Sequence, residues 1–71
     1  MDTTIIKRSI VVGGRKTSVS LENEFWDGLR YIAGTQQLSL SSLIPEIQAK
    51  YEHHNLSSAI RLFVLDHYRN R

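Results

Sequence analysis

The hydrophobic and polar positions change period along the chain. From residue 15 to residue 21 apolar and polar side chains alternate, which predicts a strand with one apolar and one polar face. From residue 25 onward the apolar residues recur at spacings of three and four, which predicts amphipathic helices. A short two-sided strand therefore leads almost directly into a helical region.

A second strand over residues 7–12 fits in front of the first. Gly13-Gly14 between them supplies the positive φ angles of a two-residue hairpin turn, and pairing Val12 with Arg15 places Ile10 opposite Thr17. The apolar face of this hairpin carries Ile10, Val12, Thr17, Val19 and Leu21, with Arg8 opposite Val19. The polar face carries Lys7, Ser9, Lys16, Ser18 and Ser20, interrupted by Val11. The two strands agree on which side is polar, which supports this register.

The N-terminal residues allow a second interpretation. Residues 1–14 would then form a mobile arm, and only the strand from residue 15 to residue 21 would be ordered. With the hairpin, we expect a disordered arm over residues 1–6 and a single domain over residues 7–71, because 71 residues suffice for one domain only.

The first predicted helix covers residues 22–33. Ser20 is a candidate N-cap and Gly34 a candidate residue just past the C-terminus. Gly28 inside this helix costs about 1 kcal/mol relative to alanine, so we expect another backbone or ring to pack closely against it.

The second predicted helix contains a proline. Leu40, Leu43, Ile44, Ile47 and Tyr51 form one apolar stripe. If Ser39 is the N-cap, Pro45 lies deep in the helix, whereas a cap at Ser41 places the proline where it costs little. We expect either the later start or a bend.

The third predicted helix covers residues 56–68, capped by Asn55 or Ser57. It is apolar on most sides, which indicates burial on more than one face. So short a chain, without cysteines for disulfides, has few other means to stabilise a core than oligomerisation. We therefore expect a homodimer with this helix at the subunit interface.

Charge is distributed unevenly. The net charge is only +2, but residues 1–20 hold four basic residues against one acidic residue. The positive field lies on the segment predicted to be strand, which indicates a polyanionic partner there or simply a solvated basic tail.

The segments KRSIVVGGRKTSVSLENEFWDGLRYIA, LSLSSLIPEI and NLSSAIRLFVLDHYR resemble the ribbon-helix-helix (MetJ/Arc-type) DNA-binding family, and in particular a small bacterial subfamily with an additional C-terminal helix. The resemblance implies a mainly α fold with a short N-terminal β-ribbon, in which the strand pairs with its counterpart in a second subunit. It implies a ribbon that enters the major groove of double-stranded DNA, and a role in transcription regulation.

The resemblance also assigns residues. It implies that the bases face Lys16, Ser18 and Ser20. Phosphate contacts are expected from Lys7, Arg8 and Arg15 and from the start of the second helix at Ser39, Leu40, Ser41 and Ser42. The dimer core is expected to contain Val19, Leu21, Leu29, Leu43, Ile47, Ile60 and Phe63.

Other chemistry finds little support. Adjacent histidines (His53, His54) point in different directions on a helix and have no H-x-x-x-H or cysteine partner, so we expect no metal site and no cofactor. No nucleophile has a credible base, so we expect no enzyme. No segment is long enough to span a bilayer, and we expect a cytoplasmic protein.

The alternative to DNA binding is a homodimeric protein-interaction module, antitoxin-like or a regulator adaptor, which binds a partner through the third helix.

Overall fold

The computed structural model describes residues 4–70, and they begin with a β-hairpin. Strand β1 (Ile5–Val12) pairs antiparallel with β2 (Arg15–Glu22). Gly13 and Gly14 join the strands at φ angles of 58° and 77°, the left-handed values that a tight hairpin turn requires. The hairpin prediction is confirmed.

The strand register also agrees with the pattern of the sequence. Val12 lies opposite Arg15, and Ile10 lies opposite Thr17. The interpretation of residues 1–14 as a mobile arm is therefore wrong for the paired part of β1. The strand begins at Ile5, two residues before the expected domain boundary, because Ile5 and Ile6 continue the ladder. Residues 1–3 of the expected arm lie outside the described residues.

Helix α1 (Asn23–Thr35) begins and ends later than predicted. Glu22 takes the N-cap position without a side-chain cap, because Ser20 remains part of β2. Gly34 lies inside the helix, and the left-handed residue past its end is Gln37, with a φ of 57°. A close neighbour is present at Gly28, but it is the Val64 side chain and not a backbone or ring: a Cβ there would lie 2.8 Å from Val64 Cγ1, whereas the Tyr68 ring lies at an ordinary contact distance of 3.7 Å.

Helix α2 (Leu40–Lys50) has the earlier of the two starts that the sequence allowed. The Ser39 side chain caps it by accepting a hydrogen bond from the Ser42 amide at 3.2 Å. Pro45 therefore lies inside the helix, so of the two expected outcomes, a later start or a bend, the later start is wrong. Both Pro45 and Ser41, whose carbonyl loses its usual partner, are exposed, so this carbonyl is open to solvent.

Helix α3 (Leu56–Arg69) agrees with its predicted range to one residue. Of the two candidate caps, Asn55 is the one used, since its side chain accepts a hydrogen bond from the Ser58 amide at 2.9 Å.

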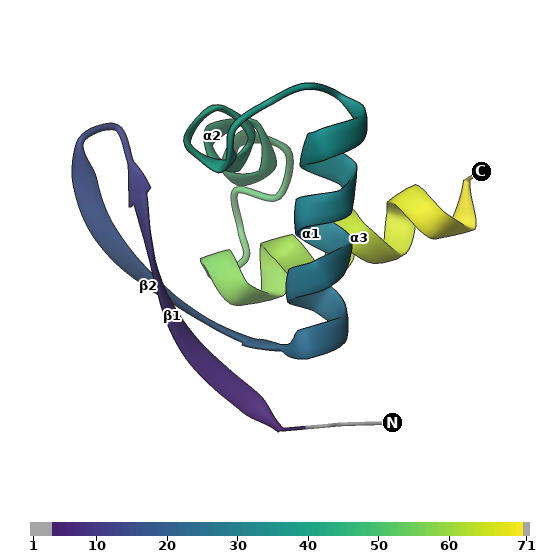
Figure 1. Ribbon diagram of the computed structural model, residues 1–71, viewed down its shortest axis with the longest axis horizontal. Helices are drawn as coiled ribbons and strands as arrows, with labels where there is room; N and C mark the ends of the chain where they lie inside the picture. Colours follow the sequence, from purple (N-terminus) through teal and green to yellow (C-terminus); the bar gives the residue numbers. More distant parts are fainter. Residues whose placement is uncertain (1–3, 71) are drawn as a thin grey trace.

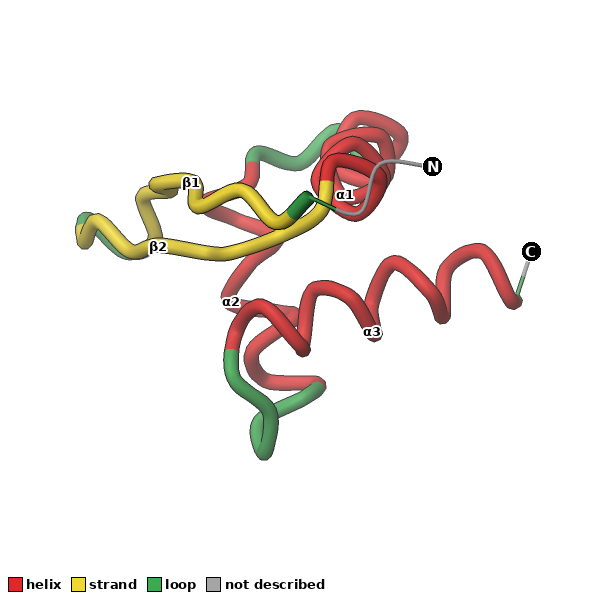
Figure 2. The backbone as a smooth tube through the Cα atoms, turned by 90° about the horizontal axis from the view of Figure 1, so that it is seen from below, coloured by secondary structure: helices red, strands yellow, loops and turns green. Residues whose placement is uncertain are grey.

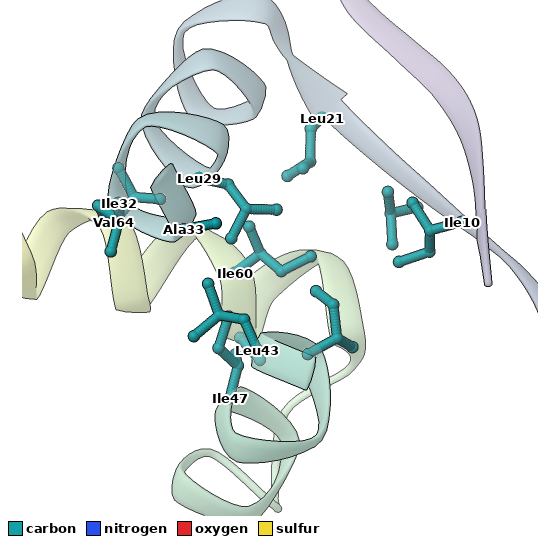
Figure 3. Close-up of a cluster of buried hydrophobic side chains, with 12 residues drawn as sticks. Ile10, Leu21, Leu29, Ile32, Ala33, Leu43, Ile47, Ile60 and Val64 are labelled. Carbon is teal, nitrogen blue, oxygen red and sulfur yellow. The ribbon is translucent and has the colours of Figure 1, made fainter. Parts of the chain in front are cut away.

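The three helices lie on one side of the hairpin (Figure 1), and α3 continues away from it toward the C-terminus (Figure 2). Helix α2 packs against β1, while α3 packs against both α1 and β2. Their apolar faces meet in one core, much of it drawn in Figure 3. Its buried residues are Ile10, Val19, Leu21, Leu29, Ile32, Ala33, Leu43, Ile44, Ile47, Ala59, Ile60 and Val64.

A single chain covers most of the side chains that were expected in a dimer core. Six of those seven residues are at most 2% exposed within one chain, and Phe63 is half-buried at the edge of the core. Each fully buried Leu or Ile contributes about 1.5–3 kcal/mol of transfer free energy. The domain therefore closes a substantial apolar core by itself.

Candidate nucleic-acid interface

The outer face of the hairpin, which points away from the core, is formed by both strands. The cross-strand pairs on this face are Lys7 with Ser20, Ser9 with Ser18, and Val11 with Lys16. The side chains alternate between faces, and the residues between these pairs form the inner face. Most of the outer-face residues are exposed, and Ser20 is half-buried. We call the set Lys7, Ser9, Val11, Lys16, Ser18 and Ser20 the outer face.

The inner face shows why the outer face remains exposed. Ile10 is 6% exposed, Val19 1% and Leu21 0%, and all three lie in the core. A one-residue shift of either strand would move these apolar side chains into water. The packing of the core therefore fixes the orientation of Lys16, Ser18 and Lys7.

Arg8 is placed differently from the other predicted phosphate ligands. It lies on the inner side of the hairpin, opposite Val19. Its guanidinium donates to the Leu21 carbonyl at 3.1 Å and to the Asn23 side chain, and it lies 4.9 Å from the centre of the Trp26 ring. These contacts hold β1 against the start of α1, so Arg8 has a structural role. Arg15 and Lys7 are exposed.

The free edge of β2 is closed at one point by α3. The Ser20 amide donates to Ser57 Oγ at 3.0 Å, and Arg61 donates to the Ser20 carbonyl at 3.1 Å. Arg61 also forms an ion pair with Glu22 at 2.9 Å. A hydrogen bond from the backbone amide of Glu22 itself, followed by the Arg61 guanidinium, lowers the pKa of the Glu22 carboxyl. We call the contacts of Ser57 and Arg61 with Ser20 the α3 clamp.

The sequence reasoning did not foresee the α3 clamp. The one signal for it was Arg61, a charged residue within the otherwise apolar run AIRLFVL. A charge within an apolar helix is stable when it is paired, and here its partners are at the end of β2.

The start of α2 offers backbone amides, as the sequence suggested. The Ser42 amide is occupied by Ser39, whose hydroxyl also hydrogen bonds to Ser42 Oγ at 3.1 Å. The amides of Leu40 and Ser41 precede the first intrahelical donor, so helix geometry leaves them without a partner in the helix. Helix α2 as a whole packs against β1 of the hairpin.

The histidines do not gather. Within residues 4–70, no group of three or more His, Cys, Asp or Glu side chains has a metal-binding arrangement. His53 lies 3.5 Å from Glu52 with both side chains largely exposed.

Tyr51 forms a contact between the end of α2 and α3. It donates a hydrogen bond to Asp66, which raises the pKa of the Tyr51 phenol to about 12. Among the described residues, no helix is both long and apolar enough to cross a membrane.

The chain consists of a strand pair followed by three helices, and this arrangement has a match among known protein families. A family model described as the ribbon-helix-helix domain matches residues 5–68, nearly the whole chain. The chain belongs to the ribbon-helix-helix family. Domains of this family generally bind DNA as transcription regulators and are not enzymes. No curated protein and no solved structure has a significant match to the chain.

Proposed function

We propose that this ribbon-helix-helix domain binds double-stranded DNA through the outer face of its hairpin and acts as a transcription regulator. The observation that carries the proposal is the division of the hairpin into two faces. Ile10, Val19 and Leu21 fix one face in the core, while the opposite face presents lysine and serine side chains to solvent. A β-ribbon of this kind fits the major groove, which is about 12 Å wide.

Base contacts are assigned to Lys16, Ser18 and Ser20. The Lys16 ammonium donates to guanine O6 or N7, and the serine hydroxyls donate to or accept from any base edge. Serine distinguishes bases less strongly than the longer amide or guanidinium side chains. We therefore propose a preference among DNA sequences that rests mainly on Lys16 and on groove shape, with a smaller contribution from Ser18 and Ser20.

Phosphate contacts position the domain without reading sequence. We assign them to Lys7 and Arg15 on the hairpin and to the start of α2, where the amides of Leu40 and Ser41 and the hydroxyls of Ser39 and Ser42 meet the positive end of the helix dipole. Arg8 is left out of this set because α1 holds its guanidinium.

We further propose that the active form is a homodimer whose subunits meet strand to strand, as the family resemblance implies. Strand β1 occupies one edge of β2 in this chain. The second subunit therefore approaches the other edge, where α3 closes only the position of Ser20.

The experiment measures binding to random duplex DNA at low and moderate salt. Lys16→Glu should weaken binding to every duplex, and the wild-type affinity should fall as salt rises. The matched control is Arg69→Glu, the same charge reversal at the C-terminal end of α3, which should have little effect. Ser18→Ala should change the preferred sequence more than the total affinity. Loss of affinity by the same factor on all duplexes would contradict the base-reading role of Ser18.

The second candidate function is protein interaction. Three large apolar side chains on α1 and α3 are exposed, namely Tyr31 at 60%, Leu65 at 45% and Tyr68 at 41%. Such a surface suits a protein partner better than a phosphate backbone. If the wild-type protein binds no duplex DNA even at low salt, the interaction module becomes the better proposal.

A further inference from the structure

A pocket lies where the C-terminal ends of the three helices meet. Its volume is about 310 Å³, and it is lined by Gln36, Lys50, Phe63, Asp66, His67 and Asn70. We propose that this pocket binds the zwitterion of an α-amino acid with an apolar side chain. The site is separate from the proposed DNA contacts, because none of these lining residues belongs to the outer face or to the start of α2.

The place and size of the pocket suit a small ligand. Gln36 is the C-cap of α1, Lys50 is the last residue of α2, and Asn70 is the C-cap of α3. Figure 2 shows α3 running away from the hairpin toward this end, so a ligand here does not compete with DNA on the outer face. Small-molecule pockets span roughly 300–1,000 Å³, and this one is at the lower end, which fits a ligand of amino-acid size.

Lys50 and Asp66 bring opposite charges to the pocket without pairing with each other. Within residues 4–70 the Lys50 ammonium forms no ion pair, and it lies 5.6 Å from the centre of the Tyr51 ring. Asp66 accepts the Tyr51 hydroxyl hydrogen bond through Oδ2, which leaves Oδ1 for a donor of the ligand. Two opposite charges that line one pocket and remain apart fit a ligand that carries both charges.

The helix ends determine which charge of the ligand lies where. Carbonyl groups at a helix C-terminus carry a partial negative charge, and three such ends line this pocket. They reinforce Asp66, which is half-buried, as the partner of the ligand ammonium group. Lys50 is exposed on a long flexible stem, so its ammonium reaches the ligand carboxylate from the rim.

Phe63 supplies the apolar part of the pocket. Its ring is half-buried and packs against the core, so its position is fixed while the remaining surface lines the pocket. An apolar ligand side chain gains free energy by leaving water for this surface, and an aromatic one gains ring contacts as well. Phenylalanine combines an ammonium group, a carboxylate and an aromatic side chain, and it is therefore the probe of choice.

The experiment compares phenylalanine with phenylpropionate, which lacks the ammonium group, and phenethylamine, which lacks the carboxylate. Binding is followed by the NMR shifts of the Gln36 and Asn70 amides, and phenylalanine should bind most tightly. Lys50→Gln should weaken phenylalanine and phenylpropionate by about tenfold and leave phenethylamine unchanged. Asp66→Asn should weaken phenylalanine and phenethylamine instead. The matched control is Arg30→Gln, which removes one exposed positive charge from α1 and should change none of the three affinities.

Tyr51→Phe separates the two roles of Asp66, because it removes the hydrogen bond and keeps the carboxylate. Phenethylamine should still bind to this variant more tightly than to Asp66→Asn. Equal weakening of all three probes by Lys50→Gln would overturn the proposal, as would unchanged pocket amides at millimolar phenylalanine. Such a result would leave the DNA-binding proposal standing, since that is tested by the hairpin variants.

Discussion

Gly28 illustrates how one missing side chain sets the distance between two helices. A Cβ at residue 28 would lie only 2.8 Å from the Val64 Cγ1 methyl group, and valine has little rotamer freedom to move away. We predict that Gly28→Ala lowers the free energy of unfolding by about 1–2 kcal/mol, because overpacking exceeds the gain in helix propensity. Urea denaturation measures this change.

The control for that prediction is Val64→Ala, which removes the methyl groups of α3 that face Gly28. Val64→Ala alone should be destabilising, because it leaves a cavity in the core. In the double variant the alanine at position 28 should cost less than in the wild-type background, since its neighbour is gone. Equal costs in both backgrounds would show that the helix crossing does not depend on this contact.

Tyr51 provides a prediction for alkaline pH. Its hydrogen bond to Asp66 raises the phenol pKa to about 12 in the folded protein, above the ordinary value of 10.0. The protonated form is therefore stabilised by folding. This contribution is complete below pH 10 and is lost as the pH rises toward 12. Titration of the phenolate absorbance should show a component with a midpoint near 12 that is absent in Tyr51→Phe.

Arg8 shows how much of the site follows from alternation alone. The predicted register already placed Arg8 opposite Val19, on the apolar side of the hairpin, but its charge led to a phosphate assignment. The structure holds the guanidinium against Trp26 and Asn23. Periodicity therefore predicted the face on which Arg8 lies. Charge alone did not predict its contacts, because these contacts depend on how the start of α1 packs against β1.

At the scale of the elements, the α3 clamp is the contact with the most direct test. Ser57→Ala removes the acceptor of the Ser20 amide without touching the apolar core. We predict faster hydrogen exchange at Ser20 and a loss of about 1 kcal/mol of stability. Ser58→Ala, on the same turn of α3, is the matched control and should leave exchange at Ser20 unchanged. Unaltered exchange in Ser57→Ala would show that α3 does not close this edge.

The helices show which element boundaries a sequence can predict. Asn55 was one of the two candidate caps because it directly precedes a clear apolar period, and α3 agrees with its predicted range to one residue. The starts of α1 and α2 depended instead on how each residue is placed in the fold. Ser20 could not cap α1 because β2 continues past it with its backbone bonded to α3, and Pro45 was tolerated inside α2 because its side of the helix faces water.

At the scale of the whole molecule, the core determines whether a single chain stays folded when the proposed dimer dissociates. The sequence suggested that each subunit completes the core of the other, but the chain buries Leu21, Leu29 and Ile60 by itself. The proposed interface involves the outer edge of one strand and leaves this core in place. Dissociation should therefore expose little apolar surface, and single chains should stay folded.

Dilution tests this expectation. We predict that the mass in sedimentation falls to that of one chain on dilution while the helical circular dichroism signal is retained. The thermal midpoint should rise only gradually with protein concentration, since binding of a second folded copy adds stability by mass action. A helical signal that disappears together with the dimer would mean that folding and association are one step. Ile60→Ala serves as the control, because loss of this buried side chain should lower stability by about 2–5 kcal/mol at every concentration.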